Sequence, residues 1–179
     1  MKYIKSTVEI KLTLSSNNTN IVKWCVGGSY AVHKDIKSHT GGIMTLGKGC
    51  VYGTSIRQKL NIKSSTELEL VATVDVLPQI VWTSYFLIEQ GYRVEKSVLY
   101  QDNQSAILLE KNGKASIGKR TRHINIRYFF MKDRTDKGEV YVFFSTEEMV
   151  GDFFTKPLLR YKFRKFRKII MNFADDGDF

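Results

Sequence analysis

Hydrophobic and polar residues alternate along the chain in a pattern that predicts a group of strands, followed by strands and helices in turn. Short apolar runs bounded by Gly, Ser or Asn are typical of strands. Such runs occur within 1–19 and at 21–26, 43–46, 50–56, 94–100 and 140–144. Gly47-Lys48-Gly49 predicts a hairpin turn that pairs the run at 43–46 with the run at 50–56.

The longest helix is predicted to begin at a capping box, because Ser64 precedes Glu67 by three residues. Apolar residues continue to about position 77, where Pro78 follows. A proline costs roughly 3 kcal/mol in a helix interior, so we expect the helix to kink or restart there and to resume over 80–90. Further helices are predicted at 105–110, 120–137 and 146–171, the last broken at Pro157. Strands followed by alternating strands and helices predict an α/β domain with a mixed sheet.

Composition and charge narrow the class of partner. The 179 residues are 42% hydrophobic and carry a net charge of +10, which points to a polyanion, although solubility alone explains part of it. The two cysteines, Cys25 and Cys50, lack a paired-ligand spacing, which argues against a disulfide scaffold and a cysteine zinc site. No signal peptide or uncharged apolar run of ~18 residues is evident, so we expect a soluble, intracellular protein with no membrane partner.

Three carboxylates occupy positions where chemistry is often placed. Asp102 follows the strand at 94–100, and ligands of open α/β sheets collect at the carboxyl ends of strands. Glu69 and Asp152 lie early in predicted helices beside apolar residues. Clustered carboxylates suit Mg²⁺ or Mn²⁺, and a two-metal site would clamp a phosphodiester. From the pattern alone Asp102 is equally a helix cap, Glu69 an exposed helix residue and Asp152 a favourable charge near a helix N-terminus.

Four stretches occur in a fixed order along the chain. They are Gln58-Lys59-Leu60 with Ser64-Ser65-Thr66-Glu67-Leu68-Glu69-Leu70, then Tyr100-Gln101-Asp102-Asn103-Gln104-Ser105-Ala106-Ile107, Arg120-Thr121-Arg122-His123-Ile124-Asn125-Ile126-Arg127-Tyr128 and Asp152-Phe153-Phe154-Thr155-Lys156-Pro157-Leu158. In order and spacing they resemble the ribonuclease H domain of the Pol polyprotein of copia-type long-terminal-repeat retrotransposons, here as a degenerate copy. The resemblance covers about 21–171.

The resemblance implies a ribonuclease H-like fold, a five-stranded mixed sheet with helices on both faces. It implies cleavage of the RNA strand of an RNA–DNA hybrid with two Mg²⁺ (or Mn²⁺) ions. Residues 1–20 would be a remnant of the connection to the polymerase, 21–172 the ribonuclease H-like domain and 173–179 a frayed acidic tail. The implied partners are nucleic acid and the reverse transcriptase part of the same polyprotein, in a cytoplasmic virus-like particle or the nucleus.

By resemblance, Glu69, Asp102 and Asp152 match the second, third and fourth catalytic, metal-binding acids of the family. The first acid is expected in the first sheet strand, in a pattern like Tyr-Val-Asp-Ala-Ser-Tyr-Ala. That stretch is here Trp24-Cys25-Val26-Gly27-Gly28-Ser29-Tyr30-Ala31. Gly27 therefore stands at the lost ligand position, and without the shared acid we expect weakened metal binding and abolished or very weak cleavage. Asp35, on the following loop, would have to fold back to replace it.

Basic residues in two of the matched stretches and on the last helix are the candidates for contact with nucleic acid. They are Arg120, Arg122, His123, Arg127, Lys156, Arg160, Lys162 and Arg164. Arginine and lysine on neighbouring elements suit phosphate contacts along a hybrid, although the same pattern describes an ordinary solvated face.

Three functions stay open on the sequence. The first is a ribonuclease H domain impaired by Gly27 that still binds hybrid. The second is an active hybrid-specific nuclease that recruits another ligand. The third is a non-catalytic nucleic-acid-binding or structural remnant of a retrotransposon polyprotein.

Overall fold

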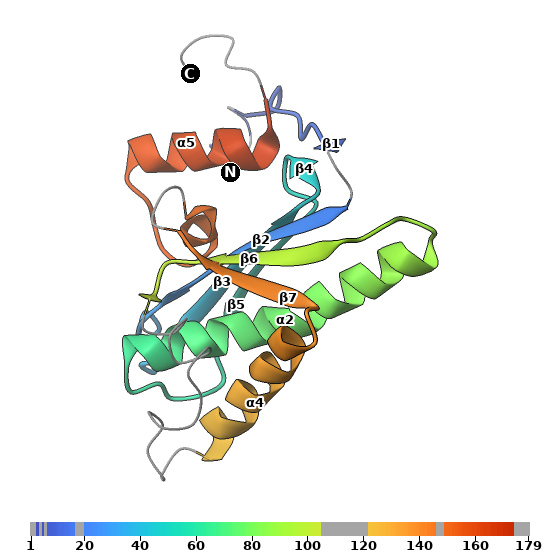
Figure 1. Cartoon of the computed structure of the whole chain (residues 1–179). Coiled ribbons are helices and arrows are strands. Elements are labelled where there is room, and N and C mark those ends of the chain that lie inside the picture. The colour runs from blue at the N-terminus through green and yellow to red at the C-terminus, as the bar shows by residue number, and fades with distance from the viewer. Residues whose placement is uncertain are drawn as a thin grey trace.

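The computed structural model describes residues 3, 5, 7–16, 20–104, 122–145 and 149–173, and its centre is a five-stranded mixed sheet (Figure 1). In spatial order the strands are β5 (Tyr52–Arg57), β3 (His39–Thr45), β2 (Ile21–Ser29), β6 (Lys96–Gln101) and β7 (Val140–Phe144). The first three strands pair antiparallel. β6 pairs with β2 in parallel, and β7 pairs with β6 in parallel. The predicted five-stranded mixed sheet is confirmed.

The N-terminal segment adds little to the sheet. Its run of alternating residues forms only β1 (Ser15–Ser16), which pairs with β4 (Gly47–Lys48) in a separate two-stranded sheet. β4 lies within the predicted hairpin connection, and β3 and β5 pair on either side of it, with Met44 opposite Tyr52. The hairpin prediction is confirmed, but its connection is longer than the three residues expected.

Helix α2 (Ser65–Glu89) runs without interruption across one face of the sheet, so the predicted restart at Pro78 is wrong. Leu77 and Ile80, on either side of the proline, are completely buried against Trp24 of β2 and its neighbours. Burial of large apolar side chains contributes roughly 1.5–3 kcal/mol each, which offsets the hydrogen bond that the proline cannot donate.

The length and composition of α2 would also suit a membrane-crossing helix, by those two criteria alone. Its apolar residues instead contact the sheet. Val76 and Leu77 join the largest core cluster together with Val22 of β2, Leu99 of β6 and Val140 of β7. The core helix of a globular domain has the same composition, and the packing of α2 is of that kind.

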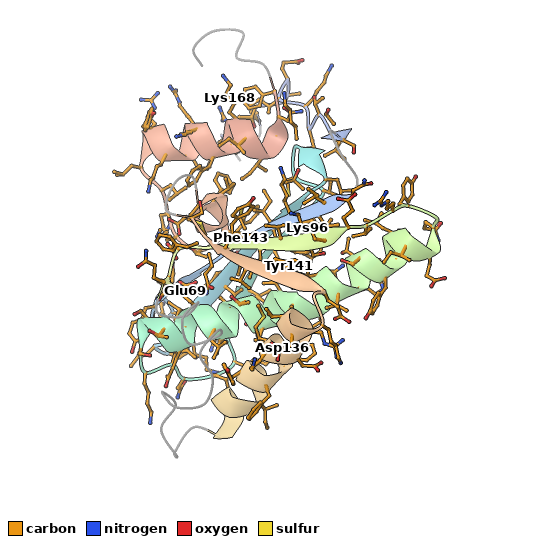
Figure 2. All side chains as sticks on the ribbon, in the orientation of Figure 1. Glu69, Lys96, Asp136, Tyr141, Phe143 and Lys168 are labelled. Carbon is orange, nitrogen blue, oxygen red and sulfur yellow. The ribbon has the colours of Figure 1, made fainter. Side chains whose placement is uncertain are left out.

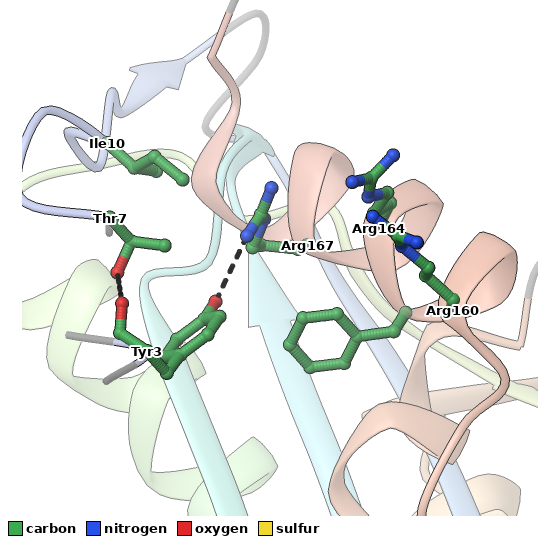
Figure 3. Close-up of a pocket in the computed structure, with 7 residues that line it drawn as sticks. Tyr3, Thr7, Ile10, Arg160, Arg164 and Arg167 are labelled. Carbon is green, nitrogen blue, oxygen red and sulfur yellow. Dashed lines mark hydrogen bonds between the residues drawn. The ribbon is translucent and has the colours of Figure 1, made fainter. Parts of the chain in front are cut away.

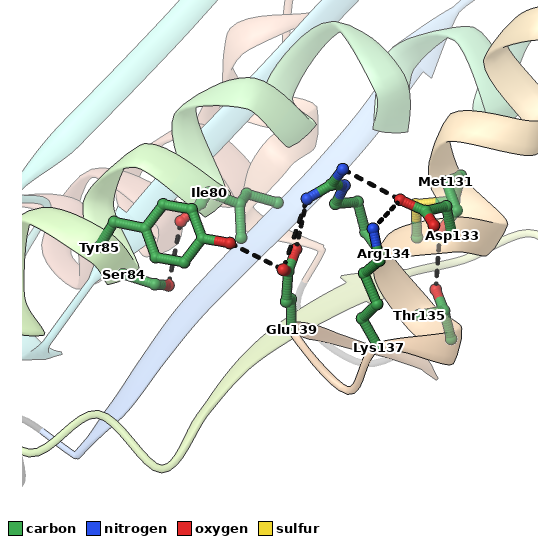
Figure 4. Close-up of polar contacts among 9 residues, drawn as sticks. All are labelled: Ile80, Ser84, Tyr85, Met131, Asp133, Arg134, Thr135, Lys137 and Glu139. Atoms are coloured by element: carbon green, nitrogen blue, oxygen red, sulfur yellow. Dashed lines mark hydrogen bonds and ion pairs between the residues drawn. The ribbon is translucent and has the colours of Figure 1, made fainter.

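Helix α4 (Arg122–Asp136) lies beside α2 and confirms the helix predicted at 120–137. Its Tyr128 is buried against Leu70 of α2. At its C-terminal end Arg134 pairs with Glu139 at 3.0 Å, and the Tyr85 hydroxyl of α2 donates to Glu139 at 2.7 Å (Figure 4). These contacts fix the turn that leads into β7. The helix predicted at 105–110 lies outside the described residues.

The opposite face of the sheet is covered by a 3₁₀ turn, η2 (Val150–Phe154), and helix α5 (Arg160–Met171) (Figure 1). Ile43 of β3 packs there with Val150, Phe166 and Ile170. The single broken helix predicted over 146–171 is therefore two elements, since α5 begins only three residues after Pro157. Helices on both faces of the sheet are confirmed.

Candidate active site

Glu69 is held at the sheet by the start of α2 (Figure 2). The Ser64 hydroxyl accepts the Glu67 N–H at 3.2 Å, and Glu67 accepts the Lys63 N–H at 2.9 Å, so the predicted N-terminal cap is present. Two residues after Glu67, the buried Glu69 carboxylate accepts the backbone N–H of Gly28 at 3.2 Å. The alternative of an exposed helix residue is thereby wrong, since Glu69 is only 6% exposed.

The electrostatics of Glu69 connect it to the other two acids. Burial, together with the negative charges of Asp102 and Asp152, raises its pKa from 4.5 to about 8. The hydrogen bond from the Gly28 N–H opposes this shift without reversing it. Nearby like charges disfavour one another's ionised form, so the three acids lie in the same part of the molecule.

Asp102 follows β6 directly, at the carboxyl edge of the sheet where the sequence places it. The residue is exposed at the surface. Partial burial and the charge of Asp152 raise its pKa, whereas the nearby Lys156 lowers it. The alternative role of Asp102 as a helix cap depends on residues beyond 104, which lie outside the described part of the chain.

Asp152 is placed by an unusually close approach of η2 to the sheet. A β-carbon on Gly151 would lie 3.1 Å from the backbone nitrogen of Gly27, and one on Gly41 would lie 2.7 Å from the Gly151 carbonyl oxygen. Glycine at these positions therefore lets the two backbones touch. The Ser55 hydroxyl of β5 fixes the end of η2 by donating to the Phe154 carbonyl at 2.8 Å.

The expected place of the first acid is open. Gly27 lies on the strand face that η2 covers, and a β-carbon there would lie 3.7 Å from Oδ1 of Asp152, an ordinary contact distance. Asp35 does not fill this place. It pairs with Arg57 at the end of β5, and β3 separates that strand from β2.

The side chains present do not form a ready-made metal site. In the described part of the chain, no three His, Cys, Asp or Glu side chains are grouped closely enough to hold an ion. Oδ2 of Asp152 is instead paired with Nζ of Lys156 at 2.9 Å. The three acids influence one another's pKa, but one of them, Asp152, is paired with a lysine. They therefore do not fit a two-metal site.

The predicted nucleic-acid contacts divide between the two faces of the sheet. Arg127 is half-buried on α4, beside the α2 layer, whereas Arg160, Lys162 and Arg164 lie on α5 on the other face. Lys156 lies between η2 and α5. Arg120 is outside the described residues, and only the backbone of Arg122 and His123 is described, within α4.

A pocket of about 430 Å³ lies between α5 and the N-terminal segment, and the sequence did not predict it (Figure 3). Tyr3 and Phe163 contact each other in it edge to face at 5.8 Å, and Arg167 donates to the Tyr3 hydroxyl at 3.3 Å. Arg160 and Arg164 complete its basic wall. The i, i+4, i+7 spacing of these arginines was the available sign that they share one helix face.

Known proteins match the chain in sequence and in fold. The retrovirus-related Pol polyprotein from transposon TNT 1-94 of Nicotiana tabacum is 33% identical over 159 residues, which is 82% of this chain and 12% of the relative. The one from transposon RE1 of Arabidopsis thaliana is 30% identical over 93% of this chain and 11% of its own length. The chain thus spans about one-eighth of these relatives. No protein-family model matches it.

Among solved structures, LC11-RNase H1, isolated from compost, superposes with a TM-score of 0.55 at 8% identity over 76% of this chain and 93% of its own. The same enzyme in complex with an RNA/DNA hybrid gives a TM-score of 0.50, also at 8% identity, over 71% and 86%. At this identity the likeness concerns the fold. The chain has a ribonuclease H-like fold, and by sequence over most of its length it belongs to the retrovirus-related Pol polyproteins of transposons.

Proposed function

We propose that this chain acts as the ribonuclease H domain of a copia-type retrotransposon Pol polyprotein that binds RNA–DNA hybrids but cleaves the RNA strand weakly or not at all. The observation that carries the proposal is Gly27. By resemblance Glu69, Asp102 and Asp152 correspond to the second, third and fourth acids of the family, whereas Gly27, at the place of the first, offers only a hydrogen atom beside Asp152.

Loss of this acid affects metal binding in two ways. Two-metal hydrolysis of a phosphodiester depends on carboxylates that hold both ions, and Gly27 cannot supply one. Without it the site has one negative charge fewer. Burial raises the pKa of Glu69 and Lys156 pairs with Asp152, and both effects lower the negative charge that the remaining acids offer a cation.

Binding to a hybrid depends on other residues and is expected to persist. Lys156 borders the acids, and Arg160, Lys162 and Arg164 follow it on α5. Arginine and lysine contact the phosphates of either strand without reading sequence. The net charge of +10 supports a polyanionic ligand. The LC11 enzyme has been solved in complex with an RNA/DNA hybrid, which supports a hybrid as that ligand.

The test measures binding and cleavage separately on a labelled RNA–DNA hybrid. The unaltered protein should bind the hybrid at moderate salt and cleave it little in Mg²⁺ or Mn²⁺. Robust cleavage that Asp102→Asn abolishes would overturn the proposed impairment and favour an active nuclease with a substitute ligand. Absence of binding at moderate salt would favour a purely structural remnant.

A further inference from the structure

Two aromatic side chains lie exposed on the edge strand β7. Val140 and Val142 pack towards α2 in the main core, and successive residues of a strand point to opposite faces. Tyr141 and Phe143 therefore point to the face that carries η2 and α5, where they remain 43% and 47% exposed. Figure 2 shows both side chains on this strand, with Lys96 beside them.

The neighbouring strand β6 extends this aromatic surface. Leu99 packs in the α2 core, so Tyr100 points to the same face as Phe143, and the two residues pair in register. Their ring centroids are 6.3 Å apart. We call Tyr100, Tyr141 and Phe143 the aromatic strip. η2 packs on β2, β3 and β5, and so covers the other half of this face.

The aromatic strip leads to the candidate active site. Tyr100 lies two residues before Asp102 at the carboxyl end of β6. Gly27 lies on the same face of the sheet, since Val26 before it packs in the α2 core. A ligand strand that crosses β7 and β6 on this face would therefore pass from the aromatic strip directly to the carboxylates.

Positive charge borders the strip. Lys96 on β6 and Lys23 on β2 are exposed, and both point to this face because Ser97 and Trp24 next to them contact the α2 side. Aromatic rings flanked by lysine are the usual platform for unpaired bases, which stack on the rings while the cations meet the phosphates. Residues two apart on a strand are about 6.6 Å apart, roughly twice the 3.4 Å rise per stacked nucleotide.

We propose that the aromatic strip binds a single-stranded nucleic acid, namely the unpaired strand that continues from a hybrid at the candidate active site. The inference rests on the proposed function for the hybrid itself, and it adds a second contact of different chemistry. The strip binds bases by stacking and is indifferent to their sequence.

The test uses three probes, a labelled oligothymidylate, a blunt RNA–DNA hybrid and the same hybrid with a single-stranded extension. The extension should strengthen binding to the unaltered protein. Replacing both Tyr141 and Phe143 with leucine keeps apolar bulk but removes the stacking rings, so it should weaken binding of the oligothymidylate and of the extended hybrid by at least about 5-fold. Binding of the blunt hybrid should not change.

Controls separate this inference from its alternatives. Tyr141→Phe keeps the ring and should bind normally, and Trp82→Leu removes an exposed ring of α2 on the other side of the sheet. The inference would be overturned if the double variant bound all probes as tightly as the unaltered protein does. It would also be overturned if the unaltered protein sedimented as a dimer and the double variant as a monomer. If the blunt hybrid alone fails to bind, the proposed function fails while the oligothymidylate still tests the strip. Tyr141→Leu alone serves if the double variant does not fold.

Discussion

Gly27 and Asp152 face each other across a space that a side chain would fill, with only 3.7 Å between a β-carbon built on Gly27 and Oδ1 of Asp152. A β-carbon at position 27 thus meets no clash, and an aspartate there would place a second carboxylate beside Asp152. The next residue differs, because a β-carbon on Gly28 would lie 2.7 Å from Cγ of Leu68. Of these two glycines only Gly27 has room for a side chain, and this is the position where the carboxylate is missing.

Gly27→Asp should therefore raise cleavage of a labelled hybrid in Mg²⁺. Loss of even an outer-shell partner lowers metal affinity by about 10- to 100-fold, so restoring a direct ligand should increase the rate by at least about 10-fold. The nearly isosteric Gly27→Asn supplies a neutral amide and should stay at the level of the unaltered protein. Cleavage that rises equally in both variants, or in neither, would contradict the role of Gly27.

The stability of two alanine variants tests the packing of this strand. Gly28→Ala should lower the free energy of unfolding by about 1–3 kcal/mol, because the new methyl group must displace Leu68. Gly27→Ala has room and removes the entropic cost of a strand glycine, so its effect should lie within about 1 kcal/mol of zero or be stabilising. Urea denaturation of both variants measures the difference. A Gly27→Ala variant that is the less stable of the two would contradict the register described for β2.

Apolar periodicity was sufficient for the elements that pack by their side chains. The strands at 94–100 and 140–144 and the helix at 120–137 were predictable because each presents one apolar face. β3 was predicted only from residue 43, whereas it begins at His39 and includes Gly41. Glycine has no strand preference of its own, and here the backbone pairing with β2 and the close approach of η2 determine the strand.

The acids of the site were found by resemblance, and their surroundings were not. The pair Lys156–Asp152 has the i, i+4 spacing that joins opposite charges in helices, so it could have been anticipated. The contact between Gly151 and Gly27 joins segments more than a hundred residues apart, and no local pattern reports it. The degree of burial of Glu69 likewise depends on the whole sheet.

Glu69→Gln should stabilise the fold increasingly as the pH rises. Glu69 has a pKa of 4.5 when unfolded and about 8 when folded, so between these values the native state holds a proton that the unfolded state has lost. Stability of the unaltered protein therefore falls as the pH rises from about 4.5 to about 8. Glutamine does not titrate, so its advantage should grow through this window and level off above it.

Thermal unfolding at several pH values measures this advantage, since each kcal/mol shifts the Tm by about 2–4 °C in a chain of this size. Glu67→Gln, at the half-buried glutamate two residues earlier, is the control. A Glu69→Gln advantage that is constant with pH, or one that Glu67→Gln shares, would contradict the burial of a protonated carboxyl.

Salt dependence tests whether α5 contacts phosphates. Each phosphate contact contributes about 0.7–0.9 to the slope of log K against log salt, so replacing Arg160, Lys162 and Arg164 with glutamine should reduce the slope for a hybrid by about 2–3. The matched control replaces Lys132 and Lys137 of the α4 region, whose charges pair with Asp136 and Asp133. If binding depended only on net charge, the two control substitutions would reduce the slope by about two-thirds as much as the three on α5. A reduction confined to the α5 variant would instead assign the phosphate contacts to the face that carries η2 and Asp152.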